Sequence, residues 1–128
     1  MKVILFACLV FAVGSANAAD WLSLGKTQGG DSEAFVDRGT ILVVGNIRSA
    51  VFQYVLDHHI DKLGKEWIVR SEQLSEYDCK KDSVHAVKLI IYLEGGGTHT
   101  SFFPDAWAPV TAPWDHVALN YLCSWQGD

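Results

Sequence analysis

Residues 57–61 gather the side chains that most often bind metals. Asp57, His58, His59 and Asp61 place two imidazoles and two carboxylates within a short stretch. Imidazole suits zinc, copper or nickel, and carboxylates can complete the coordination shell. Adjacent side chains of an extended strand point to opposite sides, so the two histidines converge only where the chain bends. The stretch therefore predicts either a solvated hairpin loop or a weak metal site.

A second group has the side-chain types of a hydrolase triad without the surrounding motif. His99 lies between two threonines, close to Ser101 and Asp105. No Gly-x-Ser-x-Gly elbow accompanies it, and alternating hydroxyl residues are typical of an exposed strand face. The glycines at 95–97 lack the Lys-Ser/Thr of a phosphate loop, so they indicate a hairpin turn. We therefore expect no catalytic residue, no cofactor and no enzymatic activity.

The chain contains five tryptophans, so an aromatic binding surface is the third candidate for a functional site. Trp21, Trp67 and Trp114 suit the core of a small sheet with one helix. Trp107, in a proline-rich stretch, and Trp125, near the C-terminus, are expected to stay partly exposed. Aromatic side chains are frequent hot spots of binding surfaces. The last two are therefore candidate binding residues, with core packing as the alternative.

Short runs of β-branched and aromatic residues between turn residues predict an antiparallel sheet. About six strands are expected, at residues 21–25, 33–37, 47–56, 67–79, 84–93 and 98–103. A tight turn at 37–40 precedes a further apolar run at 40–44. The segment 84–93 is apolar on both faces, which predicts that it is the most central strand.

A C-terminal helix is predicted after the irregular, proline-containing stretch 104–113, with Thr111 as its N-cap. Its apolar stripe is predicted from the spacing of Trp114, Val117, Ala118, Tyr121 and Trp125. Cys123 lies off this stripe, so either the helix ends before it or its disulfide lies at the edge of the sheet. Strands followed by one helix indicate an α+β domain.

Residues 1–18 have the pattern of a cleaved signal peptide. Lys2 precedes an apolar run of 11 residues, and an Ala-x-Ala site ends at Ala18. The run is shorter than the ~20 residues that span a membrane. Cys8 lies inside the run rather than after it, which favours soluble export over lipidation. We predict cleavage after Ala18, one domain at 19–128 and no transmembrane segment in those 110 residues.

Charge and cysteines support export to an oxidising compartment. Without residues 1–18, nine Lys and Arg face fifteen Asp and Glu, a net charge of −6. This charge argues against binding to nucleic acid or to anionic membranes. Cys79 and Cys123 then remain as an even pair, and no Cys-x-x-Cys redox motif is present. We therefore predict a Cys79–Cys123 disulfide in a periplasmic, secreted or cell-surface protein.

Several short motifs, taken in order, resemble the surface-adhesin protein E family of small exported bacterial domains. They are WLSLG at 21–25, FVD with TI at 35–41, EYDC at 76–79, a glycine-rich hairpin, WAPV at 107–110 and a helix ending in Cys123. The resemblance covers nearly all of residues 19–128. It implies one antiparallel sheet with a helix packed on it and a Cys–Cys bridge.

The resemblance also implies a function. The family is named for an adhesin that attaches bacteria to the host extracellular matrix, although many members are small exported proteins of undetermined role. The first hypothesis is an adhesin-like module that binds host or envelope proteins through an exposed sheet face or the 107–110 loop. The alternative is a periplasmic carrier of a small ligand or metal that uses His58 and His59.

Overall fold

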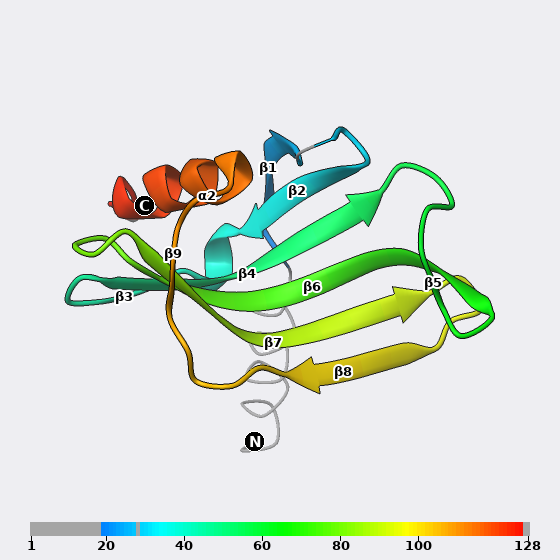
Figure 1. The fold of residues 1–128 in the computed structure, drawn as a ribbon. Helices are drawn as coiled ribbons and strands as arrows, with labels where there is room; N and C mark the ends of the chain where they lie inside the picture. Colours follow the sequence, from blue (N-terminus) through cyan, green and yellow to red (C-terminus); the bar gives the residue numbers. More distant parts are fainter. Residues whose placement is uncertain (1–18, 28, 127–128) are drawn as a thin grey trace, which may run out of the picture.

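Alternating strand residues and glycine-rich turns fold into one antiparallel sheet, with a helix over one face (Figure 1). The computed structural model describes residues 19–27 and 29–126, so the predicted signal peptide lies outside the described residues. The main strands are β1 (Trp21–Lys26), β2 (Ser32–Asp37), β4 (Ile47–Leu56), β6 (Glu66–Asp78), β7 (Ser83–Leu93) and β8 (Thr98–Phe102). The short elements are η1 (Arg38–Thr40), β3 (Leu42–Val44), β5 (Lys62–Leu63) and β9 (Ala108–Pro109), and the helix is α2 (Pro113–Cys123).

The strand order is β1-β2-β4-β6-β7-β8, and the three short strands β3, β5 and β9 pair with β4, β6 and β7. All pairs are antiparallel, which confirms the predicted fold class. The prediction that 84–93 is the most central strand is wrong, because β4 and β6 occupy the middle of the order. An apolar run indicates that both faces of a strand are covered, but it does not indicate the position of that strand in the sheet.

The apolar run at 40–44 is interrupted rather than continuous. The side chain of Asp37 accepts hydrogen bonds from the backbone N–H of Asp20 and of Gly39, both at 3.0 Å. Thr40 Oγ1 donates to the Asp37 carbonyl at 2.7 Å and accepts from the Val51 N–H at 2.9 Å. These bonds hold η1 between β2 and β3, which pair with successive parts of β4.

The core lies between the sheet and α2. Its buried residues are Val36, Ala50, Phe52, Tyr77, Val110, Ala118, Leu119 and Leu122. The Phe52 ring meets the rings of Tyr77 and Trp114 edge-on, each with centroids 5.9 Å apart. Edge-to-face pairs add stabilisation to the burial of apolar area. Trp21 and Trp67 are half-buried outside this cluster, so the prediction that they belong to the core is wrong.

The helix differs from the prediction in its cap and in its buried face. Ala112, not Thr111, is the N-cap, and it makes no side-chain cap bond. Val117 is 44% exposed, whereas Leu119 and Leu122 are buried. Ala118 is buried and Trp114 and Tyr121 pack against the core as predicted, so the buried stripe is shifted only part of the way around the helix axis. The disulfide accounts for this, because it turns the side of α2 that carries Cys123 toward the end of β6.

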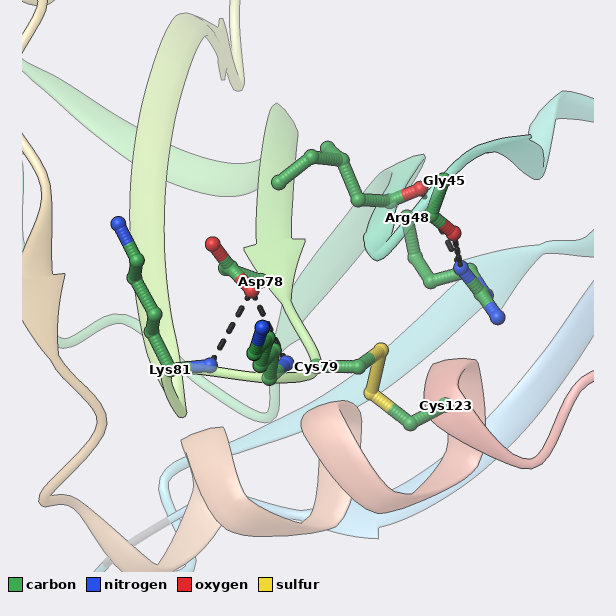
Figure 2. Close-up of a disulfide and its surroundings, with 8 residues drawn as sticks. Gly45, Arg48, Asp78, Cys79, Lys81 and Cys123 are labelled. Carbon is green, nitrogen blue, oxygen red and sulfur yellow. Dashed lines mark hydrogen bonds between the residues drawn. A yellow bond between two sulfur atoms is a disulfide. The ribbon is translucent and has the colours of Figure 1, made fainter.

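A disulfide joins Cys79, directly after β6, to Cys123 in the last turn of α2 (Figure 2). The predicted bridge is confirmed, and the helix extends through Cys123 rather than ending before it. The Cys79 N–H donates to the Asn46 carbonyl at 2.9 Å, and the Asp78 side chain caps the following turn by accepting from the Lys80 and Lys81 N–H groups. The bridge therefore fastens the helix to a strand end that is itself well held.

Among the described residues, no helix combines the length and the apolar character that crossing a membrane requires.

Candidate binding surface

The side chains of the 57–61 loop go to separate partners. Asp57 forms an ion pair with Lys26, with Nζ and Oδ2 2.7 Å apart, and this hydrogen bond raises the pKa of the lysine. His59 pairs with Glu94 at 2.7 Å and stacks on Trp67, with ring centroids 4.7 Å apart. His58 and Asp61 are exposed. Among residues 19–27 and 29–126, no group of three or more His, Cys, Asp or Glu side chains is placed to hold a metal ion.

The triad-like residues are not brought together either. His99 and Ser101 lie two positions apart on β8, which places them on one face of the sheet. Asp105 instead approaches His85, with Oδ1 3.7 Å from Nε2. His85 is buried, and its Nδ1 lies 3.0 Å from Oε1 of Glu76. His85, in β7, is therefore paired with Glu76 on one ring nitrogen and only approached by the exposed Asp105 on the other, away from the hydroxyl groups of β8.

The face of the sheet opposite α2, called here the open face, carries rows of side chains set by the strand register. Adjacent strand residues alternate between faces, so the neighbours of buried Ala50 and Phe52 point to the open face. The register aligns Val51, Leu74, Lys88 and Phe102 in one row and Gln53, Glu72, Ile90 and Thr100 in the next. No described element lies over this face (Figure 1).

The most exposed large apolar side chains point to the open face, at its two opposite edges. Phe102 is 73% exposed in β8, and Val44 and Leu42 are 73% and 63% exposed in β3. Leu42 pairs with Ser49, and Val44 pairs with Ile47. Ser49 and Ile47 alternate along β4 with buried Ala50, so they and their partners point to the open face. Exposed apolar side chains that share one face mark an interaction site more often than scattered ones do.

On the open face Arg70 and Glu72 neutralise each other, whereas Lys88 lies over the Phe102 ring, 5.8 Å from its centre. Arg70 donates to Glu72 at 2.9 Å, and its guanidinium lies 3.6 Å from the centre of the Tyr92 ring. The Tyr92 hydroxyl donates to the same glutamate at 3.2 Å. A shallow hollow of about 150 Å³ lies beside this network, between Leu74 and Ile90. The face therefore offers apolar contacts with paired charges between them.

The two candidate tryptophans lie apart. Trp107 is 42% exposed, and its ring lies 5.4 Å from that of His85, at the border of the open face. Trp125 is half-buried beside Tyr121 at the end of α2. Phe102 and Leu42 were not among the predicted site residues. Only the pairing of β3 and β8 with longer strands shows that they share a face with each other.

A cleft of about 330 Å³ opens on the other face, between the sheet, the first turn of α2 and the connecting segment, residues 103–112. In Figure 1 this segment rises from β8 past β9 to α2. The cleft is lined by Gln73, Val84, Ala86, Phe103, Pro104, Ala106, Ala108 and Asp115. Its walls are mostly apolar, with one carboxylate and one amide, which is the usual composition of a ligand site.

Two tyrosines beside this cleft are held neutral. Burial raises the pKa of Tyr54 and of Tyr77 above the ordinary value, and the Asp115 charge raises both further. The Tyr77 hydroxyl donates to Oδ1 of Asp115 at 3.1 Å. Both phenols therefore stay protonated, and Tyr77 serves as a hydrogen-bond donor to Asp115 rather than as a base.

The fold described above, an open antiparallel sheet with a C-terminal helix tied to it by a disulfide, is a protein E-like fold. A crystal structure (crystal form II) of Haemophilus influenzae protein E is similar to this chain, with a TM-score of 0.50 and 15% sequence identity. The similarity covers 80% of this chain and 87% of that one. No protein-family model and no curated protein sequence matches the chain. The disulfide and the fold are consistent with an exported protein.

Proposed function

We propose that this protein is an exported, adhesin-like binding protein of the bacterial cell envelope that holds a protein partner on its open face and performs no catalysis. The observation that carries the proposal is the position of Leu42, Val44 and Phe102. These three are the most exposed large apolar side chains of the described residues, and all point to the face that α2 leaves uncovered.

The paired charges suit a protein partner better than a lipid surface or nucleic acid. Arg70 is already bound to Glu72 and stacked on Tyr92, so its charge is compensated within the sheet. Binding to anionic surfaces depends on clustered cations without such partners. Protein interfaces instead combine aromatic anchors with a few satisfied polar groups. The similarity in fold to protein E adds a weaker indication toward adhesion.

Photo-crosslinking in the cells that export the protein tests this proposal. A photoactivatable phenylalanine analogue at position 102 should give one discrete adduct that excess unlabelled protein suppresses. The same analogue at Val43 is the matched control, because Val43 is 51% exposed on the other side of the same short strand as Leu42. Equal labelling from both positions, or no adduct from position 102, would contradict the proposal.

The partner recovered in this way is then purified for binding measurements. Phe102→Ser should weaken binding by about thirtyfold, the effect expected of a hot-spot residue. Val43→Ser should leave the affinity unchanged. Adhesion to the host additionally requires surface display, so recovery of the protein from the periplasm alone would restrict the partner to the envelope.

A further inference from the structure

The polar side chains that line the cleft under the connecting segment are the Asp115 carboxylate and the Gln73 amide. Gln73 donates one N–H of its Nε2 to the Ser75 hydroxyl at 2.8 Å, and its carbonyl oxygen is available as an acceptor. Asp115 accepts from the Tyr77 hydroxyl through Oδ1. No Lys or Arg of the described residues forms an ion pair with Asp115. A ligand that satisfies this site therefore carries donors and positive charge.

Asp115 lies in the first turn of α2, where the helix dipole attracts negative charge. The hydrogen bond from neutral Tyr77 orients the carboxylate without neutralising it. A cation that enters the cleft therefore meets a carboxylate that Tyr77 holds in place, beside mostly apolar walls.

We propose that this cleft binds an arginine side chain presented by a protein partner. A guanidinium has five donors in one plane, which suits a carboxylate and an amide carbonyl that both accept, whereas an ammonium is a point charge. Phe103 offers an aromatic face and Ala106 an apolar wall for the methylene groups. The volume of about 330 Å³ is sufficient for such a side chain.

That the arginine belongs to a protein partner rests on the proposed function. The preference of the cleft for a guanidinium does not. β8 is the last strand of the sheet, and Phe102 on the open face is followed by Phe103 in the cleft. A partner that covers the open face and crosses this edge would therefore reach both sites. Its arginine would enter the cleft on the far side.

Nuclear magnetic resonance titration of the exported, disulfide-bonded protein with Nα-acetyl-arginine methylamide tests the inference. We expect saturable shifts of the Gln73 side-chain amide and of the Ala106 backbone amide, with a dissociation constant on the order of 1 mM for so small a probe. Asp115→Asn should weaken binding at least tenfold, while its amide oxygen still accepts from Tyr77 and preserves the fold. Asp105→Asn is the matched control. This exposed carboxylate lies on the connecting segment but faces His85 rather than the cleft.

Two further probes make the outcome decisive. The neutral citrulline analogue should not bind, and the lysine analogue should bind at least fivefold more weakly. Equal binding of arginine and lysine, or loss of binding in Asp105→Asn, would overturn the assignment. Absence of arginine binding while Phe102→Ser still disrupts a partner complex would overturn this inference alone and leave the proposed function standing.

Discussion

Tyr77 and Asp115 connect the middle of the sheet to the first turn of the helix, with the phenol oxygen 3.1 Å from Oδ1. Tyr77 is fully buried in β6, and its ring packs against Phe52. The hydrogen bond therefore fixes the helix start over the core, just as the disulfide fixes the helix end. One contact is polar and the other covalent, and both use residues at or next to the end of β6.

Removal of the Tyr77 hydroxyl should lower the stability of the fold by a small, measurable amount. Tyr77→Phe should lower the free energy of unfolding by about 1 kcal/mol, the net value of a partly buried hydrogen bond. Urea unfolding measures the change. Tyr92→Phe is a matched control on the open face, where water can replace the lost bond, and it should cost less. Equal losses in the two variants would contradict the structural role assigned to the Tyr77–Asp115 bond.

Stability should fall in alkaline solution. The pKa values of Tyr54 and Tyr77 are raised in the folded protein, whereas in the unfolded chain a tyrosine titrates near pH ~10. The unfolded state therefore loses these protons first, so the stabilisation is complete below pH ~10 and is lost as the pH rises above it. With both phenols protonated in the folded state, the loss approaches about 2.7 kcal/mol per pH unit. Urea unfolding between pH 8 and 11 should show it, and Tyr77→Phe should roughly halve the slope.

The disulfide should supply a large share of the stability. It spans 44 residues, and closing a loop of that length stabilises a fold by about 4 kcal/mol on the chain-entropy model. The double variant Cys79→Ser/Cys123→Ser should therefore unfold at a much lower urea concentration. Reduction of the unaltered protein is the matching control and should shift the midpoint equally. An unchanged midpoint after reduction would show that the bridge contributes nothing.

The rotated face of α2 can be tested by comparing two apolar residues of the same helix. Leu122→Ala should cost about 2–5 kcal/mol, because it leaves a cavity at a fully buried site. Val117→Ala should change the free energy of unfolding by less than ~0.5 kcal/mol, as expected of an exposed position. Thermal unfolding followed by circular dichroism compares them. A larger loss of stability in Val117→Ala than in Leu122→Ala would support the apolar stripe predicted from sequence.

We expect no specific zinc uptake by the 57–61 loop. His59 already pairs with Glu94 and stacks on Trp67, and Asp57 is bound to Lys26. Calorimetry with zinc should give only the heat of dilution. Zinc uptake that disappears in a His58→Ala/His59→Ala variant would contradict this expectation and revive the carrier hypothesis.

Local patterns predicted the strands well because runs of β-branched residues and the turn residues that bound them can be read in the local sequence. The ends of β4 at residues 47 and 56 coincide with the prediction, since a glycine turn and a polar loop bound an uninterrupted β-branched run. The pairing of β6 with β7 was less accessible. It shifts register between Ile68 and Arg70 and again between Leu74 and Ser75, and such irregularities depend on the partner strand.

The candidate surfaces escaped prediction for the same reason. Phe102 and Leu42 are 60 residues apart in the sequence and share a face only through four successive strand pairings. Gln73 and Asp115 likewise line one cleft only because the connecting segment returns the chain to the sheet before α2 begins. Periodicity within one element contains no information on such distant neighbours.

The bridge between Cys79 and Cys123 turns the last third of the chain into a closed ring that contains β7, β8, the connecting segment and α2. The stretch 102–109 is exposed, so an added protease should cut there first. A single nick there opens the ring without releasing a fragment, since both products stay joined through sulfur. The nicked protein would keep its mass on a gel until a reductant separates the two pieces.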